Sequence, residues 1–385
     1  MQMENKSCKV AVMECAAYDA ALLAKKLDEG AALLGGWDRW VRPGSTVLLK
    51  LNLIRPMPPE SAAVTHCELV RALVRILKGR GCNVWVGDSS GGAIAGRAQT
   101  GRTLQVSGIE KMAEEEGAIV KNFDREGVVE VKTAGGGAMH LARPMFDADF
   151  VINVPKLKTH TAAVVTLAMK NLFGCVPGLG KALYHRASPT AEALGEVLCD
   201  IHSAVRVGLH IVDGVTAMDR LGPVTGQRFP AKKLLLGTDA LAVDAVAAKM
   251  MGLGLQELPI YRTALRRGLG QWRLDAIDVC GDYDAPPSLK DFRLPPRMLS
   301  RGGSGALQRI VGLMKTRPQI DLKACKDCGI CVDSCPMQVI DRETKRIDYS
   351  KCIGCMCCHE MCILGAVRLV KANPLMRALS VFRRS

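Results

Sequence analysis

A cysteine-rich repeat near the carboxyl end constrains the fold of this chain more than any other feature. The segment CKDCGICVDSC occupies residues 325–335, and CIGCMCCHEMC occupies residues 352–362. When the two copies are aligned, Cys325, Cys328, Cys331 and Cys335 coincide with Cys352, Cys355, Cys358 and Cys362. The fifth cysteine of the second copy, Cys357, coincides with Ile330 and is therefore a spare thiol.

Both copies have the spacing C-x2-C-x2-C-x3-C, which is the bacterial pattern for ligation of two [4Fe–4S] clusters. Three closely spaced thiolates bind one cluster, and the fourth thiolate reaches to the other cluster. Gly329 and Gly354 suit the tight turns that bring backbone N–H groups to the cluster sulfurs. The expected ligands are Cys325, Cys328, Cys331 and Cys362 for cluster 1, and Cys352, Cys355, Cys358 and Cys335 for cluster 2.

Structural zinc is the alternative, but zinc sites usually set two CxxC pairs apart, and three cysteines at two-residue gaps fit that geometry poorly. The second copy departs in one respect, because Ile363 follows Cys362 whereas Pro336 follows Cys335. We expect altered tuning rather than loss of a cluster. The tail resembles a two-cluster bacterial ferredoxin domain over residues 319–371, which implies an electron relay rather than a purely structural centre.

The 385 residues divide where the composition changes. We expect an α/β domain at residues 1–292, a basic linker at 293–318, the ferredoxin domain at 319–372 and a basic tail at 373–385. The net charge is +14, and residues 293–317 hold six basic and no acidic side chains. This segment is either a solvated linker or a surface that docks an acidic redox partner, nucleic acid or anionic lipid. It holds no aromatic residue, so we expect no nucleic-acid partner.

Cysteine usage predicts the compartment. The chain has 16 cysteines, and its N-terminus lacks a basic region followed by a continuous apolar stretch, so we expect no signal peptide. We expect no transmembrane segment, because no stretch reaches about 18 uncharged apolar residues. These features favour metal sites in a reducing cytoplasm over a secreted disulfide scaffold.

Hydrophobic runs alternate with helical patterns through the first 280 residues, which predicts an α/β fold with a largely parallel sheet flanked by helices. Continuous apolar runs such as FVINV are typical of strands that are covered on both faces. Residues 122–142 predict an inserted hairpin. The expected strands are 46–51, 83–87, 150–154, 209–212, 233–236 and 276–280, and the expected helices are 66–78, 104–116, 161–173, 191–204 and 240–251.

The densest motif outside the tail is FVINVPKLKTHTAAVVTLAMKNLFGCVPGLGKALYH, at residues 150–185. The helix expected at 161–173 would begin beside lysines, and a helix N-terminus of this kind attracts anions. Burying the lysine at position 170 is costly unless it is paired. The alternative is that the lysines extend along the surface, which we favour for Lys158 considered alone. The expected group is Lys156, Lys158, His160, Lys170 and Asn171.

Polar residues follow other predicted strands, and the carboxyl ends of parallel strands form the usual ligand-binding edge of such a sheet. A single Asp at such a place is more often a helix cap or a turn residue. The segment GDSSGGAIAG at residues 87–96 could cradle phosphate but fits neither GxGxxG nor GxxxxGK[ST]. The residues expected to converge are Lys50, Asn52, Asp88 and Asp213.

Several motifs together resemble the domain-of-unknown-function 362 family: LKLNL at 49–53, VGDSSGG at 86–92, NVPKLKTH, MKNLFGCVPG and GKALYH within 150–185, and IVDGV at 211–215. The resemblance covers about residues 8–285 plus the tail and implies iron–sulfur clusters without naming a substrate. Where the family tends to have an acidic residue before Gly-x-Gly-Pro, this chain has DRLGP at 219–223. The matching positions are Lys156, Lys158, His160, Lys170, Asn171, Gly174, Pro177, Gly178, Lys181 and His185.

Three functions remain open. In an oxidoreductase, the ferredoxin module would exchange electrons with a small anionic substrate or further cofactor, with Lys170 in the site and His160 or His185 as the general acid. In a non-catalytic carrier, the large domain would dock the clusters to a partner redox enzyme. In a maturation factor, Asp88 and Asp213 would hold a metal or cofactor. Cys15, Cys175 and Cys357 are either redox-active thiols, with Cys175 inside the central motif, or small buried apolar residues, which is the commoner role of a lone cysteine.

Overall fold

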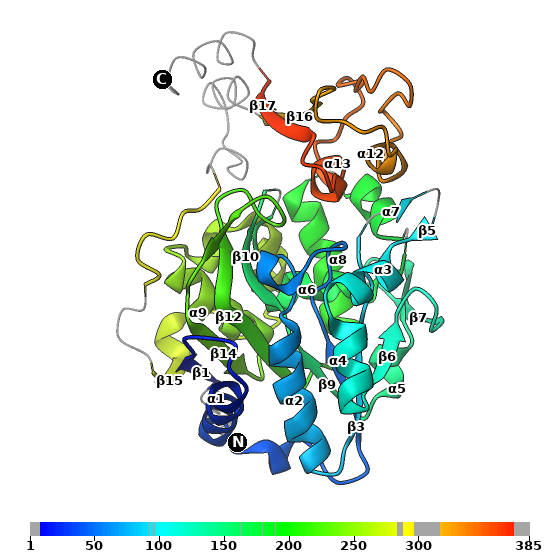
Figure 1. Cartoon of the computed structure of the whole chain (residues 1–385). Coiled ribbons are helices and arrows are strands. Elements are labelled where there is room, and N and C mark those ends of the chain that lie inside the picture. The colour runs from blue at the N-terminus through cyan, green and yellow to red at the C-terminus, as the bar shows by residue number, and fades with distance from the viewer. Residues whose placement is uncertain are drawn as a thin grey trace.

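The computed structural model describes residues 8–91, 93–94, 97–161, 163–178, 180–188, 190–282, 288–295 and 316–372. A large α/β domain carries a small cysteine-rich module at one end of its sheet, as Figure 1 shows. The expected α/β class is confirmed.

The large domain is built on a mixed sheet with the strand order β15-β1-β14-β12-β9-β2-β3-β6. Along this order, β14 runs antiparallel to both neighbours, and every other pair is parallel. The sheet is therefore largely parallel, as its continuous apolar strands predict. The strands are β15 (Ile277–Gly281), β1 (Cys8–Glu14), β14 (Lys233–Gly237), β12 (Leu209–Asp219), β9 (Phe150–Asn153), β2 (Thr46–Lys50), β3 (Asn83–Asp88) and β6 (Ile119–Asn122).

Helices cover both faces of this sheet, because side chains alternate between the faces along each strand. Leu49 of β2 belongs to the core formed with α1, α2 and α4, whereas its neighbour Leu48 belongs to the core formed with α8 and α9. The helices on the first face are α1 (Ala20–Leu33), α2 (Cys67–Gly79), α3 (Thr100–Val106) and α4 (Ile109–Glu116), and the second core includes α8 (Ala191–Ala204), α9 (Ala240–Met250) and α10 (Arg262–Arg267).

Most predicted elements are present within a few residues of their expected bounds, and the hairpin expected at 122–142 is formed by β7 (Val128–Lys132) and β8 (Ala138–Ala142). The helix expected at 104–116 is divided into α3 and α4, with Gly108 at a φ of 74° between them. A left-handed backbone at that position interrupts a continuous helix. The strand expected at 209–212 runs on as β12 to Asp219.

The helix predicted at 161–173 is wrong. Residues 156–160 form β10 (Lys156–His160), which pairs with β12 and with the short β11 (Val164–Thr166). Helical structure begins only at α6 (Ala168–Asn171), which a 3-10 turn at Leu172–Cys175 continues. It begins where Asp244 accepts hydrogen bonds from the amides of Ala168 at 2.7 Å and Met169 at 2.9 Å. The β-branched run TAAVVT favours an extended chain, and the lysines consequently lie on a strand rather than at a helix N-terminus.

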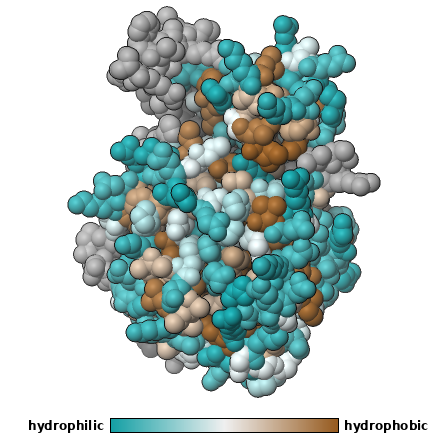
Figure 2. Space-filling model, viewed as in Figure 1, coloured by the Kyte–Doolittle hydropathy of each residue, from teal (hydrophilic) through white to brown (hydrophobic). Residues whose placement is uncertain are grey.

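The C-terminal module contains an antiparallel pair, β16 (Thr316–Ile320) with β17 (Val367–Lys371), and two short helices, α12 (Ile330–Asp333) and α13 (Cys357–Met361). Arg55 of the large domain donates to the carbonyl of Glu360 at 2.7 Å, and Thr225 is 3.1 Å from His359 Nε2. Figure 2 shows apolar residues gathered on the module, above a mostly hydrophilic large domain. The basic linker between 296 and 315, its expected helical part and the basic tail from 373 lie outside the described residues.

Within the described part of the chain, no helix is both long and apolar enough to cross a membrane.

Candidate functional site

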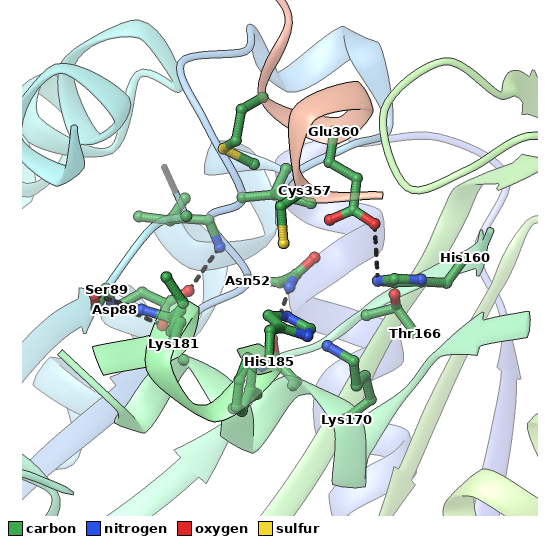
Figure 3. Close-up of a pocket in the computed structure, with 18 of the residues that line it drawn as sticks. Asn52, Asp88, Ser89, His160, Thr166, Lys170, Lys181, His185, Cys357 and Glu360 are labelled. Atoms are coloured by element: carbon green, nitrogen blue, oxygen red, sulfur yellow. Dashed lines mark hydrogen bonds and ion pairs between the residues drawn. The ribbon is translucent and has the colours of Figure 1, made fainter. Parts of the chain in front are cut away.

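A cavity of about 120 Å³ lies between the carboxyl ends of the sheet strands and the C-terminal module. Figure 3 shows how side chains from both parts point into it. Most of the residues expected from the sequence converge here. Its polar lining consists of Asn52, Asp88, Ser89, Lys158, His160, Thr166, Lys170, Asn171, Lys181, His185, Ser334, Cys357 and Glu360, and its apolar lining includes Leu53, Ile54, Phe173, Ala182 and Met361.

The module contributes the side of the cavity that sequence reasoning missed. Cys357, Glu360 and Met361 all come from α13. In Figure 3 the Cys357 thiol points toward Asn52, and it also shares a hydrogen bond with the thiol of Cys355. Its departure from the internal repeat was the only signal in the sequence, and that signal does not say where the thiol points.

Lys170 enters the cavity from α6, which Asp244 anchors. The ammonium lies 4.9 Å from the centre of the Phe173 ring. Among the residues that the structure describes, it donates no hydrogen bond. Burial lowers the pKa of Lys170, while the charges of Glu360 and Cys357 oppose that shift. A buried ammonium without a hydrogen-bond acceptor is costly, so this group is available to a ligand.

Two histidines flank Lys170. The amide of Ala163 donates to His160 Nδ1 at 3.2 Å, which leaves the proton of the neutral ring on Nε2, 3.5 Å from Glu360 Oε1. Burial, followed by the charges of Lys170 and Lys158, holds the pKa of His160 well below 6.5. Burial also lowers the pKa of His185 to about 3. Both rings are therefore neutral near pH 7.

The other two cavity lysines already have acceptors. Lys158 donates to the carbonyl of Ala63 at 2.5 Å, and burial lowers the pKa of Lys158 to about 7. Lys181 donates to Ser89 Oγ at 2.6 Å, and burial lowers the pKa of Lys181 to about 8. Lys158 is almost wholly buried, so it does not extend along the surface as was favoured for it alone. On the opposite wall, burial raises the pKa of Glu360 to about 7.

A buried ion pair underlies this wall of the cavity. Lys50 Nζ lies 2.9 Å from Asp88 Oδ1 and also donates to the carbonyl of Asn171 at 2.5 Å. A Cβ added at Gly174 would collide with both charged groups, so only glycine allows the chain to pass there. Asn52 donates to Asn171 Oδ1 at 2.8 Å, which connects this pair to the cavity.

Lys156 and Asp213 lie outside the cavity and pair with each other at 2.8 Å, both fully buried. Tyr18 donates to Asp213 Oδ1 at 2.7 Å and accepts from Lys156 at 2.6 Å. The second carboxylate oxygen also accepts from the amide of His66 at 2.9 Å. These contacts indicate that the pair stabilises the fold. Among the described residues, no group of three or more His, Cys, Asp or Glu side chains is arranged to hold a single metal ion.

The cysteines of the module fit two [4Fe–4S] clusters in the cross-paired arrangement. Burial raises the pKa of Cys331 to about 11, and the charges of Cys362, Cys325 and Cys328 add to that effect, so these four thiols are neighbours. Burial likewise raises the pKa of Cys358, with further contributions from Cys355, Cys335, Cys352 and Cys331.

Backbone donors and turns also suit the clusters. The amide of Asp327 donates to Cys325 Sγ at 3.4 Å and that of Ala366 to Cys362 Sγ at 3.2 Å. Gly329 and Gly354 have φ values of 72° and 67°, the left-handed turns for which glycine is suited. Such hydrogen bonds to sulfur tune cluster potentials.

Comparisons with known proteins agree with this division. Residues 47–249 match the family described as "Domain of unknown function (DUF362)", and residues 317–363 match "4Fe-4S dicluster domain". The "Thylakoid-associated protein sll1697" of Synechocystis is 31% identical over 262 residues, which cover 68% of this chain and 79% of that protein.

Two further relatives match the module alone. "Pyruvate synthase subunit PorD" of Methanothermobacter marburgensis is 40% identical over 53 residues, 14% of this chain and 64% of that protein. "Uncharacterized ferredoxin MJ0199" of Methanocaldococcus jannaschii is 34% identical over 55 residues, 13% of this chain and 89% of that protein. The chain therefore belongs to the domain-of-unknown-function 362 family and ends in a ferredoxin-type domain for two [4Fe–4S] clusters.

Proposed function

We propose that this protein is an oxidoreductase in which the iron–sulfur module exchanges electrons with a small anionic molecule bound in the cavity beneath α13. One cluster would be held by Cys325, Cys328, Cys331 and Cys362, and the other by Cys352, Cys355, Cys358 and Cys335. The large domain supplies most of the binding groups, and the module supplies Cys357 and Glu360.

The position of α13 is the observation that carries this proposal. Cys357 faces the cavity while its neighbours Cys355 and Cys358 belong to the cluster-binding repeat. A molecule in the cavity would consequently touch the loop that holds a cluster. If the module only carried electrons to another protein, the large domain would need no ligand cavity beside it.

Electron transfer to an unsaturated or carbonyl group also requires protons. Lys170, His160 and His185 all line the cavity. The lowered pKa of Lys170 makes its ammonium a better acid near neutral pH, so Lys170 is the proposed proton donor. His160 and His185 were expected as general acids, but their lowered pKa values leave them neutral, and we assign them the role of donating a hydrogen bond to a developing oxyanion.

The proposed binding set follows the placement of each residue. Lys158, Lys181, Asn52 and Asn171 shape the site from the large domain. Lys50 and Asp88 support that wall as a buried pair. Lys156 and Asp213, outside the cavity, are proposed to stabilise the fold instead.

The test uses anaerobic protein reduced with dithionite and then freed of the reductant. Small anions that carry a C=C or C=O group are added singly, and re-oxidation is followed through the visible absorbance of the clusters. We expect at least one anion to re-oxidise the wild-type protein faster than Lys170→Met. Lys111→Met is the matched control, because that lysine is exposed.

Two outcomes would contradict the proposal. If the clusters cannot be reduced, the module does not relay electrons. If every anion re-oxidises wild type and Lys170→Met at the same rate, the cavity takes no part in the reaction. Re-oxidation only by a partner protein, steeply weakened by salt, would favour the carrier function and an acidic docking surface on that partner. We propose the reducing cytoplasm as the location, on the basis of cysteine usage.

A further inference from the structure

We propose that the cavity binds a short-chain monocarboxylate, with the carboxylate on Lys170 and Thr166 and a short apolar body against Phe173 and Met361. This inference names the class of anion for the proposed oxidoreductase and rests on that proposal for its redox meaning. The binding itself can be measured without any electron transfer.

Several buried polar groups in the cavity lack hydrogen-bond partners among the residues that the structure describes. Asn52 Oδ1 and Glu360 Oε1 are acceptors, and two other groups can donate. The Lys170 side chain has no acceptor for its ammonium, although the residue is only 9% exposed. The Thr166 hydroxyl is also unpartnered, and that residue is 4% exposed. Figure 3 shows both side chains on the side of the cavity where His160 lies. Buried polar groups are nearly always satisfied, so these two donors point to a missing acceptor.

Lys170 differs from the other buried lysines around the cavity because those lysines already have partners. Lys50 pairs with Asp88 at 2.9 Å, Lys158 donates to the carbonyl of Ala63 at 2.5 Å, and Lys181 donates to Ser89 Oγ at 2.6 Å. One carboxylate group on a ligand would supply the acceptor that the Lys170 ammonium lacks. A second carboxylate on the same ligand would find no further unpartnered ammonium among the described lining residues.

The cavity size limits the ligand. An apolar cavity of roughly 150 Å³ admits benzene, and this cavity measures about 120 Å³. By that comparison, a ligand held wholly inside the cavity has about six non-hydrogen atoms or fewer. A nucleotide, a flavin or a long acyl chain does not fit within it.

The lining also has an apolar part. Leu53, Ile54, Phe173, Ala182 and Met361 contribute hydrocarbon or thioether surface. Apolar surface gains free energy when it contacts an apolar ligand, whereas a strongly hydrated inorganic oxyanion gains nothing from it. The described residues that line the cavity include no arginine, the side chain best matched to bidentate phosphate binding. A carboxylate head with a short hydrocarbon body fits both parts of the lining.

Isothermal titration calorimetry with the oxidised, anaerobic holoprotein tests this assignment. The probes are butanoate, its neutral isostere butanamide, inorganic phosphate and decanoate. We expect saturable binding of butanoate and no binding of the other three. Lys170→Met should weaken butanoate binding by at least about tenfold, because a charge-assisted contact is lost, and Thr166→Val by about three- to tenfold. Lys111→Met should bind as wild type.

Three results would each overturn the assignment. The first is that butanoate does not bind, the second is that it binds wild type and both cavity variants equally, and the third is that phosphate binds more tightly than butanoate. Thr166→Val changes little in shape, so it keeps the test valid even if Lys170→Met folds poorly. Butanoate binding without re-oxidation of reduced clusters by any anion would leave this inference standing and refute the proposed reaction. Anion-dependent re-oxidation without carboxylate binding would do the reverse.

Discussion

Replacing Lys156 with methionine separates a structural lysine from a ligand-binding one. The central motif suggests that this lysine binds an anion, but the structure pairs it with Asp213 at 2.8 Å, with both side chains fully buried. Methionine has a similar length and no charge, so Lys156→Met leaves the Asp213 carboxylate buried without its cation. Removing one partner of a buried ion pair typically costs about 3–5 kcal/mol.

We expect the loss of stability in Lys156→Met to lie at the lower end of that range. After the substitution, Asp213 still accepts hydrogen bonds from the Tyr18 hydroxyl at 2.7 Å and from the amide of His66 at 2.9 Å. These two donors continue to stabilise the carboxylate, so we expect a loss of about 3 kcal/mol in the free energy of unfolding. For a domain of this size, with an unfolding entropy of about 0.6 kcal/mol/K, that loss lowers Tm by about 5 °C.

The assay is anaerobic thermal unfolding followed by far-ultraviolet circular dichroism, together with butanoate titration at 25 °C. The double variant Lys156→Met/Asp213→Asn is the control, because it removes the unpaired charge and keeps an acceptor for Tyr18. It should regain most of the lost stability. A Lys156→Met protein with wild-type Tm but no butanoate binding would refute the reasoning, since it would make Lys156 a ligand-binding group.

Three other predictions use different parts of the molecule. Cys357→Ala should keep the wild-type iron and sulfide content, because this thiol lies outside the repeat; loss of a cluster in elemental analysis would contradict that. Gly174→Ala should lower the free energy of unfolding in urea by about 1–3 kcal/mol, because the new Cβ meets Asp88, whereas Gly79→Ala, with open space around it, should not. Burial raises the pKa of Asp244 from 3.8 to about 7. The folded state therefore holds this proton more tightly, and the free energy of unfolding should fall as pH rises across that interval, a slope that Asp244→Asn removes.

Parts of the fold that follow from a local sequence pattern could be predicted. The internal cysteine repeat identifies a dicluster domain, because ligation demands a fixed spacing. The apolar strands of the sheet could also be predicted, because a strand covered on both faces needs continuous hydrophobic residues. The first strand, β1, and helix α1 were not predicted. The apolar residues of CKVAVME are interrupted by a charged side chain, and the strand is identified only by its partners β14 and β15.

The site was predicted in part, and its errors have one cause. The residues Lys158, His160, Lys170 and His185 do converge on the cavity. Lys170 lies in a helix as expected, in α6, but Lys158 and His160 lie on β10 and not in a turn before a helix. The error arose because a run of small and β-branched residues can form either a buried helix or a strand. The pairing of β10 with β12 decides the matter, and that pairing involves residues more than fifty positions away.

What the sequence alone does not contain is the way in which the two parts meet. Helix α13 spans only five residues, too few to be stable in isolation. It lies between cysteines of the cluster-binding repeat, so cluster ligation would hold it in place. Because α13 also carries Cys357 and Glu360 into the cavity, the chemistry that binds iron and the surface that would bind a ligand depend on the same short helix. Arg55 strengthens this dependence from the other side, since its buried guanidinium donates to the Glu360 carbonyl. The module is in this sense one wall of the site, and the large domain would be left with an open cleft in its absence.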